Sequence, residues 1–263
     1  PRQIRVYQAM GVAVEDFPLF AHLPFVMGQD NAKLSKRNGE VSIAWYRESG
    51  FLPEAICNYL ALLGWSPGDD REDVSMSELV ELFVLERVNS SPARFDMKKL
   101  EAINGEKIRN LTLDDFLSRA LPFLLKDGVI SGKDGELKVL RQALPIIQER
   151  IARMNEVSAM LKFLFTDELS FDQEASAALS NEQAKAVIAK SLEVLQGVDD
   201  WNHVAIEAKL REALIDQMAL KPRLAFSPVR IAVTGSHISP PLFESMELLG
   251  KQRCISRLNA AVS

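Results

Sequence analysis

Residues 52 to 64 read LPEAICNYLALLG, and this stretch predicts a helix with clearly marked ends. Pro53 stands at a first-turn position, where a missing N–H costs no hydrogen bond, and Gly64 supplies the stop. Ser75 to Glu78 then forms a capping box ahead of an apolar run, and Thr112 caps a further predicted helix. Signals of this kind continue along the chain, so we predict a mainly α-helical protein.

Helical spacing extends through the second half of the sequence. Apolar residues from Leu137 to Leu161 recur in steps of three and four, which predicts one long amphipathic stripe bent at Pro145. A second capping box is predicted over residues 180–183, and Ser227-Pro228 and Ser239-Pro240 each pair an N-cap with a first-turn proline. We therefore expect short to medium helices from about residue 50 to the end.

Composition and charge limit the class of protein. Apolar residues make up 47% and charged residues 25% of the 263, the balance of an ordinary globular protein, and no apolar run approaches the roughly 20 residues of a membrane helix. The net charge is −5, but residues 221–263 carry six Lys or Arg against two acids, a net of +4. Such a basic segment can bind phosphates locally. With two cysteines and three scattered histidines, a metal site is not expected.

The most informative stretch outside the helices is a basic loop bounded by glycines, Gly28 to Gly39. Before it, Gln3 to Met10 predicts a helix and Phe17 to Met27 predicts a loop that leads into a strand. Two lysines three apart, Lys33 and Lys36, flank Ser35, and Arg37 adds a third cation. Mobile cations that close on the phosphates of ATP stabilise developing negative charge. The plain alternative, from spacing alone, is a solvated basic loop.

Several long matches give this chain a family resemblance. Residues 33–37, KLSKR, resemble the KMSKS signature of class I aminoacyl-tRNA synthetases in the form typical of the glutamyl branch. The resemblance continues in order through residues 46–66, 89–109 and 228–250, and so covers essentially the whole chain. It implies the short end of a class I catalytic domain with the KMSKS-type loop, then a helical stem-contact domain and an α-helical-cage anticodon-binding domain. We place these domains at residues 1–45, 46–130 and 131–263.

The resemblance also assigns roles to individual residues. In the loop, Lys33, Ser35 and Lys36 are the implied catalytic residues, and Lys36 is the implied ATP contact. The implied anticodon-binding residues are Arg150, Arg230, Ser239 and Leu242. Stem contacts are expected from Arg94, Lys98, Lys99, Lys107 and Arg109. The acidic run at residues 69–73 is expected to face away from phosphate, as a solvated turn.

From the residues alone, plainer roles remain open for the anticodon set. Arg150 could form a surface ion pair with Glu149 or Glu156, and Arg230 could be a solvated residue at the opening of a short helix. On pattern alone, Leu242 belongs to a core rather than to a base contact. Arg150 and Arg230 are also the residue types that stack on and hydrogen-bond unpaired bases, so both readings stand.

The resemblance further implies an activity and a set of partners. The complete enzyme would join glutamate to tRNA-Glu with ATP and Mg²⁺, as a cytoplasmic monomer with no DNA or membrane partner. Glutamate and ATP would bind mainly through an upstream half, since no HIGH-type motif occurs in these 263 residues. Rival interpretations are the C-terminal part of a class I lysyl-tRNA synthetase and a non-catalytic helical interaction module. A glutaminyl enzyme, with β-barrel anticodon domains, fits the helical tail less well.

We predict that this chain alone does not activate glutamate, because the HIGH-type motif and the implied glutamate pocket are not in it. The measurement is ATP–pyrophosphate exchange with and without glutamate. A clear glutamate-dependent signal would contradict the interpretation of the chain as the tRNA-binding portion of the enzyme.

Overall fold

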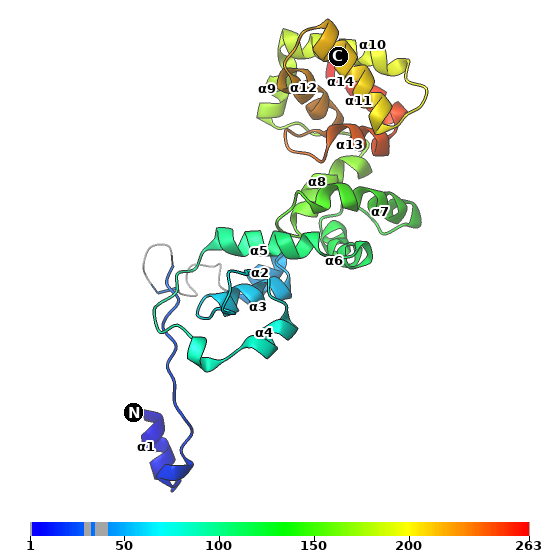
Figure 1. Ribbon diagram of the computed structural model, residues 1–263. Helices are drawn as coiled ribbons and strands as arrows, with labels where there is room; N and C mark the ends of the chain where they lie inside the picture. Colours follow the sequence, from blue (N-terminus) through cyan, green and yellow to red (C-terminus); the bar gives the residue numbers. More distant parts are fainter. Residues whose placement is uncertain (1, 29–32, 35–41, 263) are drawn as a thin grey trace.

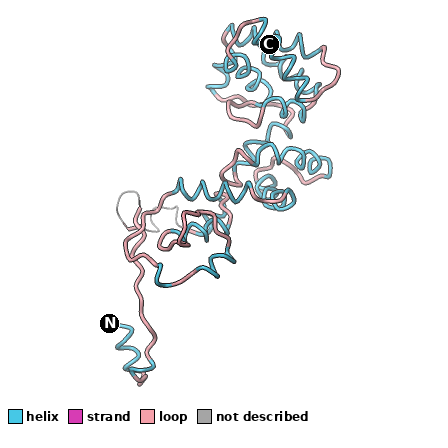
Figure 2. Tube along the Cα trace, in the orientation of Figure 1, coloured by secondary structure: helices cyan, strands magenta, loops and turns pink. Residues whose placement is uncertain are grey.

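The protein is a succession of helices. The computed structural model describes residues 2–28, 33–34 and 42–262, and helices connected by loops make up nearly all of this part of the chain (Figures 1 and 2). Extended pairing within it is limited to two isolated bridges at Met27. The expected mainly α fold is confirmed. No helix among these residues is long and apolar enough to cross a membrane.

The N-terminal segment lies apart from the other helices. Helix α1 spans Arg2–Ala9, which confirms the helix predicted from Gln3 to Met10, and a short 3₁₀ turn, η1, spans Val14–Asp16. An extended segment then leads to the next body of helices (Figure 1). The expected loop before a strand is therefore a loop that ends in a bridge at Met27 rather than in a regular strand.

The second group of helices begins where the sequence marks its starts. Its elements are α2 (Ile43–Glu48), α3 (Pro53–Leu62), α4 (Met76–Leu82), η3 (Leu85–Arg87) and α5 (Met97–Arg109). Pro53 occupies the first turn of α3, and the Ser75–Glu78 capping box is present at α4. Asp96 caps α5 by accepting hydrogen bonds from the backbone N–H groups of residues 98 and 99.

The third group contains a correction. Its helices are α6 (Leu113–Lys126), α7 (Asp134–Gln148) and α8 (Glu156–Phe165). The stripe predicted as one helix bent at Pro145 is two helices, and the chain breaks at residues 149–155 instead. Pro145 lies inside α7 and does not end it. The break falls where the backbone N–H of Met154 is bound by the carbonyl of Gly50, outside any helix.

The C-terminal group is the largest. Its elements are α9 (Gln173–Ser180), α10 (Glu182–Gln196), α11 (His203–Arg211), the π-helical turn η4 (Glu212–Gln217), α12 (Pro222–Thr234), α13 (Leu242–Leu249) and α14 (Lys251–Val262). Figure 1 shows these helices gathered at the end of the molecule opposite α1. Helix α14 packs on α10 and α12, and α13 contacts α7, which joins this group to the third one.

Three predicted helix starts in this group were wrong. Asn181, not Ser180, caps α10, and its side chain accepts from the N–H of Ala184. Helix α12 starts at Pro222, the earlier of two prolines that suit a first turn, so Pro228 lies inside it and removes one hydrogen bond. Helix α13 starts at Leu242, because the Ser239 hydroxyl is used for other bonds and does not cap it.

A single apolar core extends from α2 to α14. It includes Tyr46 at one end, Ile130 near the middle and Leu258 at the other, all largely buried. A small separate cluster of Trp65, Val74 and Leu79 lies beneath the turn before α4. The predicted domain boundaries at residues 45 and 130 stay predictions, and the core crosses residue 130 without interruption.

The turn at residues 49–52 makes an unusually close backbone approach to the break after α7. Gly50 has a φ of +83°, and a Cβ built there would lie 2.4 Å from the Asn155 nitrogen and 2.6 Å from the Met154 nitrogen. The Gly50 carbonyl accepts a 2.9 Å hydrogen bond from the Met154 N–H. Only glycine fits at position 50, because the backbone there is left-handed and because no space is left for a Cβ atom.

We predict that Gly50→Ala lowers the free energy of unfolding by about 3 kcal/mol or more, from backbone strain together with overpacking. Gly128→Ala is the matched control, because Gly128 also has a positive φ, +66°, but has nothing within 4 Å of its built Cβ. The control should lose only about 1 kcal/mol. Urea unfolding followed by circular dichroism measures both, and equal losses would contradict the close-approach argument.

Candidate functional site

The root of the basic loop is held by backbone hydrogen bonds to Met27. The Leu34 N–H donates to the Val26 carbonyl at 3.0 Å, and Met27 bridges to Lys33 on one side and to Arg94 on the other. The Phe95 N–H donates to the Met27 carbonyl at 2.8 Å. The segment that begins the loop and the segment that leads into α5 are therefore both bonded to residues 26–27.

Of the three predicted catalytic residues, Lys33, Ser35 and Lys36, only Lys33 is among the residues that the structure describes. Its Nζ lies 3.8 Å from the centroid of the Phe25 ring, a cation–π distance, and the residue is exposed. Ser35 and Lys36, the other two residues of the predicted catalytic set, lie outside the described residues. The structure shows where Lys33 lies: Lys33 and Arg94 each form a backbone bridge with Met27.

Three of the five predicted stem-contact cations already have carboxylate partners. Lys99 Nζ lies 2.7 Å from Glu72, Lys107 forms an ion pair with Asp73, and Arg109 lies 2.7 Å from Glu106. Lys98 is exposed and has no ion pair with a described residue. Two acids of the 69–73 turn are thus ion-paired with predicted stem-contact lysines.

The acidic turn at residues 69–73 is solvated, as expected, since all five residues are exposed, and two of its acids also pair with lysines of α5. The turn is placed by Asn58, which is fully buried at the centre of α3. The Asn58 amide donates to the Glu72 carbonyl at 3.0 Å, and its oxygen accepts from the Val74 N–H at 3.0 Å. These two bonds hold Glu72 and Asp73 against α5, a tertiary arrangement that the local sequence does not indicate.

Arg230 lies in the middle of α12, not at the opening of a short helix as predicted. Its Nη1 donates to the Ser239 hydroxyl at 2.5 Å and to the Pro240 carbonyl at 2.7 Å. Burial lowers the pKa of Arg230, and the positive charge of Arg150 lowers it further, whereas Glu244 opposes both effects. An arginine guanidinium is not deprotonated in proteins, so Arg230 keeps its positive charge.

Arg150 lies within electrostatic range of Arg230, in the connection that follows α7. Arg150 follows the C-terminal end of α7, is exposed, and lies close enough to Arg230 to repel its charge. The alternative ion pair with Glu156 does not form, because Glu156 binds Arg153 at 3.2 Å. Ser239 is buried beside Arg230, so three of the four predicted anticodon residues converge.

Leu242, the fourth, is the first residue of α13 and is only 3% exposed. Its side chain belongs to the apolar core, as the pattern alone had indicated. Leu242 follows directly after the Ser239–Pro241 turn that receives Arg230, and so it fixes that turn against the core rather than presenting a wide surface of its own.

An open cavity of about 540 Å³ lies between α7 and α13. Its lining residues are Gln142, Ile146, His203, Glu244, Glu247 and Leu248. The hydrogen bonds from His203 lower the pKa of Glu247, with Nδ1 at 2.6 Å from the carboxylate, so Glu247 stays ionised to lower pH than usual. Sequence reasoning missed Glu244 and His203, since residues 142, 203 and 244 share no motif or spacing.

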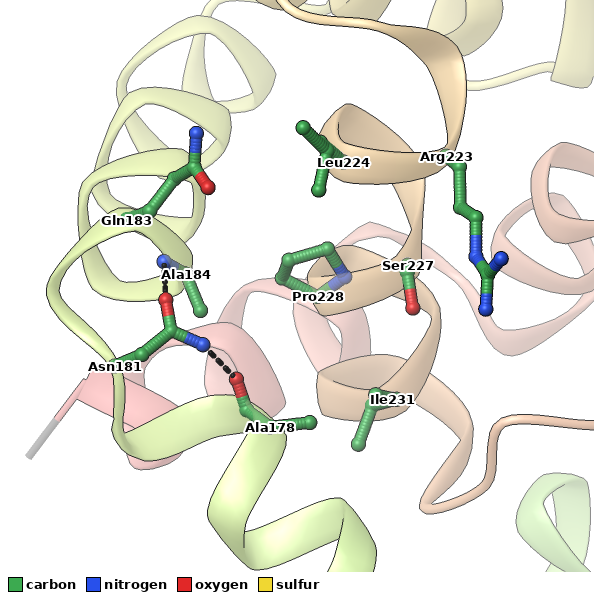
Figure 3. Close-up of a pocket in the computed structure, with 9 residues that line it drawn as sticks. All are labelled: Ala178, Asn181, Gln183, Ala184, Arg223, Leu224, Ser227, Pro228 and Ile231. Atoms are coloured by element: carbon green, nitrogen blue, oxygen red, sulfur yellow. Dashed lines mark hydrogen bonds between the residues drawn. The ribbon is translucent and has the colours of Figure 1, made fainter.

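A smaller cavity of about 150 Å³ lies between the α9–α10 junction and α12 (Figure 3). Arg223, Ser227 and Pro228 line it from α12. The polar groups of Asn181 on the opposite wall are used locally, its oxygen by the Ala184 N–H and its amide by the Ala178 carbonyl. This cavity offers little unsatisfied polar surface to a ligand.

The cations of the basic C-terminal segment serve mainly to cap other helices. Arg257 Nη1 and Nη2 donate to the carbonyls of Val233, Phe163 and Thr166 at 2.6–2.8 Å. Arg253 donates to Leu164 and Thr166, and Lys251 to Gln196 and Val198. With Arg230, four of the six cations in residues 221–263 are bound to backbone carbonyls, which leaves fewer of them for the local phosphate binding that the charge of this segment predicts.

Comparison with known families agrees with this arrangement. A model described as "Anticodon binding domain" matches residues 115–262. A second, described as "tRNA synthetases class I (E and Q), catalytic domain", matches residues 1–102. The chain belongs to the glutamyl-tRNA synthetase family. These two matches fit neither the lysyl interpretation nor the interaction-module interpretation.

Individual relatives place the chain within this family. It is 48% identical over 269 residues to the glutamate–tRNA ligase of a Nocardioides species, with 100% of the chain and 55% of the relative covered. The glutamate–tRNA ligase of Saccharopolyspora erythraea is 46% identical, covering 99% of the chain and 53% of the relative. The chain therefore spans about half the length of the glutamyl-tRNA synthetases it matches.

A solved glutamyl-tRNA synthetase has the same architecture. The crystal structure of a glutamate tRNA ligase from Elizabethkingia meningosepticum, in complex with its amino acid, superposes with a TM-score of 0.78. It is 28% identical and covers 99% of the chain and 54% of that structure. The helical cage that carries Arg150 and Arg230 is therefore an architecture shared within the glutamyl-tRNA synthetase family.

We predict that Arg257→Lys lowers the free energy of unfolding by about 2–4 kcal/mol, because an ammonium cannot bridge three carbonyls from two helices. Burial, then the charge of Arg253, lowers the pKa of Arg257 to about 10, so it is still protonated at neutral pH. Arg223→Lys, at an exposed position of the same basic segment, should change stability by less than about 0.5 kcal/mol. Equal, small effects in urea unfolding would contradict the capping role.

Proposed function

We propose that this chain is the tRNA-binding and ATP-loop portion of a glutamate–tRNA ligase. In that reaction glutamate and ATP form glutamyl-adenylate, and the glutamyl group passes to the 3′ end of tRNA-Glu with release of AMP. The observation that carries the proposal is the convergence of Arg150 and Arg230 beside Ser239, within a family whose C-terminal part is an anticodon-binding domain.

The two arginines suit unpaired nucleotides rather than a carboxylate of this protein. Neither guanidinium has an ion pair with another described residue, and the two charges repel each other. Both hydrogen bonds of Arg230 use Nη1, so Nε and Nη2 can donate to a base edge or phosphate. An electron-rich ligand placed between them would relieve the repulsion. Ser239 orients Arg230, and Leu242 supports the turn that holds it.

Stem binding is proposed for Arg94, Lys98, Lys99, Lys107 and Arg109, and among these Lys98 is exposed and has no ion pair with a described residue. The ion pairs of Lys99, Lys107 and Arg109 reduce what those three can contribute, since each would have to give up a carboxylate to bind phosphate. Backbone contacts of this kind position a tRNA and carry little sequence information. Arg94 forms a backbone bridge with Met27, so a stem contact at Arg94 would lie beside the root of the proposed ATP loop.

The ATP loop is proposed to act through cations. Lys36 would contact the phosphates of ATP, with Lys33 and Ser35 shaping the loop, and preorganised positive charge would stabilise the transition state. No group of three or more His, Cys, Asp or Glu side chains able to hold a metal ion occurs among the described residues, so we derive no step through Mg²⁺. A monomeric, cytoplasmic enzyme without DNA or membrane partners completes the proposal.

We predict saturable, salt-sensitive binding of tRNA-Glu in a filter-binding titration. A substitution in the anticodon should weaken binding about tenfold, the effect of one good base contact. Arg230→Ala or Arg150→Ala should remove most of that difference while leaving a residual affinity from backbone contacts.

Arg223→Ala provides the charge-matched control. This substitution removes one exposed cation of α12. It should therefore lower the affinity equally for tRNA-Glu and for the anticodon-substituted tRNA, and leave the ratio of the two affinities unchanged. If the chain bound the two tRNAs equally well before any substitution, the proposed anticodon role would be wrong.

A further inference from the structure

A fully buried asparagine joins α5 to the segment that carries Arg150. Asn104 is 0% exposed, and its oxygen accepts from the Leu52 N–H at 2.7 Å. Its amide donates to the Ala152 carbonyl at 2.5 Å, and the Gly50 carbonyl lies at 3.5 Å from the same nitrogen. One side chain thus bonds the turn before α3 and the α7–α8 connection at once.

The surface of α5 is shaped to receive this connection. A Cβ built on Gly105 would lie 3.6 Å from the Ala152 Cα and 3.7 Å from the Ile151 carbonyl, in van der Waals contact with both, so a side chain larger than a methyl group would press on this connection. At the start of the connection, the Gln148 amide donates to the carbonyls of Ile108, Arg109 and Leu111. The α7–α8 connection is therefore bonded to α5 at both Gln148 and Ala152.

Arg150 lies between these two attachment points. Its N–H donates to the Ile147 carbonyl at 2.8 Å, and the next residue, Ile151, is 1% exposed in the core. The Ala152 N–H is also bound, to the Glu156 carboxylate at 3.2 Å. The exposed Arg150 side chain therefore projects from a backbone with almost no freedom, although none of these bonds involves its guanidinium.

We propose that Asn104 is a positioning residue for Arg150: by bonding Ala152 and Leu52 together it sets where the Arg150 guanidinium meets an anticodon base. The inference rests on the proposed function and deepens it. Asn104 itself is buried and touches no nucleic acid, so its effect on recognition passes entirely through the α7–α8 connection. It would govern discrimination between tRNAs rather than overall affinity.

The test is a double-mutant cycle on tRNA discrimination. The readout is the dissociation constant for a transcript substituted at the third anticodon base divided by that for tRNA-Glu, measured with the full 263-residue chain. Arg150→Ala should lower this ratio about tenfold. Asn104→Ala should lower it about threefold or more in the unmodified chain, and should change it little when Arg150 is already alanine.

Asn58→Ala is the matched control. Asn58 is the other fully buried asparagine of this half, and it makes two bonds of similar length to the 69–74 turn instead. Both variants should lower the melting temperature by similar amounts, whereas only Asn104→Ala should lower the discrimination ratio. An equal loss of the ratio in both variants would show general destabilisation and overturn the proposal.

A second variant keeps the test decisive if Asn104→Ala does not fold. Gly105→Val leaves Asn104 in place but adds two methyl groups to a Cβ that would already lie 3.6 Å from the Ala152 Cα, so it should displace the same segment. It should also lower the ratio only when Arg150 is present. An unchanged ratio in a folded variant would overturn the positioning role alone, whereas an unmodified chain that does not discriminate would overturn the proposed function itself.

Discussion

The backbone of Gly50 lies against the backbone of residues 154–155 with no room for a side chain between them. That approach brings an N–H of the α7–α8 connection to a carbonyl at the start of α3, and Asn104 closes the same junction with its buried amide. Buried backbone groups that lose such partners are costly, so the junction admits little adjustment. The placement of Arg150 relative to α5 and to the root of the loop follows from it.

The distribution of charge separates structural cations from those available to a ligand. Lys251, Arg253 and Arg257 neutralise carbonyl ends of helices, where a positive charge is favourable. Lys99 and Lys107 are matched to acids of the neighbouring turn. Arg150 and Arg230 have no ion pair with a described residue, and they are the two arginines that we propose for tRNA recognition. The net charge of a segment is therefore a poor guide to where this protein would contact nucleic acid.

Local signals predicted the secondary structure well where one residue determines it. The capping box at Ser75, the proline at residue 53 and the cap at Thr112 all hold, because each acts within one helical turn. The prediction failed where two signals compete, as between Pro222 and Pro228, or where a distant partner ends a helix, as Gly50 does near Met154. Such outcomes depend on contacts across roughly a hundred residues.

In the candidate site, too, some residues could be predicted from the sequence and others could not. Resemblance to the family pointed to Arg150, Arg230 and Ser239, and the structure brings these three together. Nothing in the sequence pointed to Asn104, which bonds segments about fifty residues away on either side, or to Glu244 on α13, whose charge raises the pKa of Arg230. Asparagine is common at helix caps and turns, so a buried asparagine inside a helix has no signature of its own.

The arginines of α14 have a consequence for how the chain folds as it is synthesised. Helices α8 and α12 leave the ribosome well before residue 257, yet their carbonyl ends are completed only by Arg253 and Arg257. At the usual rates of about 5–20 residues per second, the N-terminal bodies have several seconds to form first. The C-terminal cage closes last, and until then its apolar faces are exposed to chaperones and to neighbouring nascent chains.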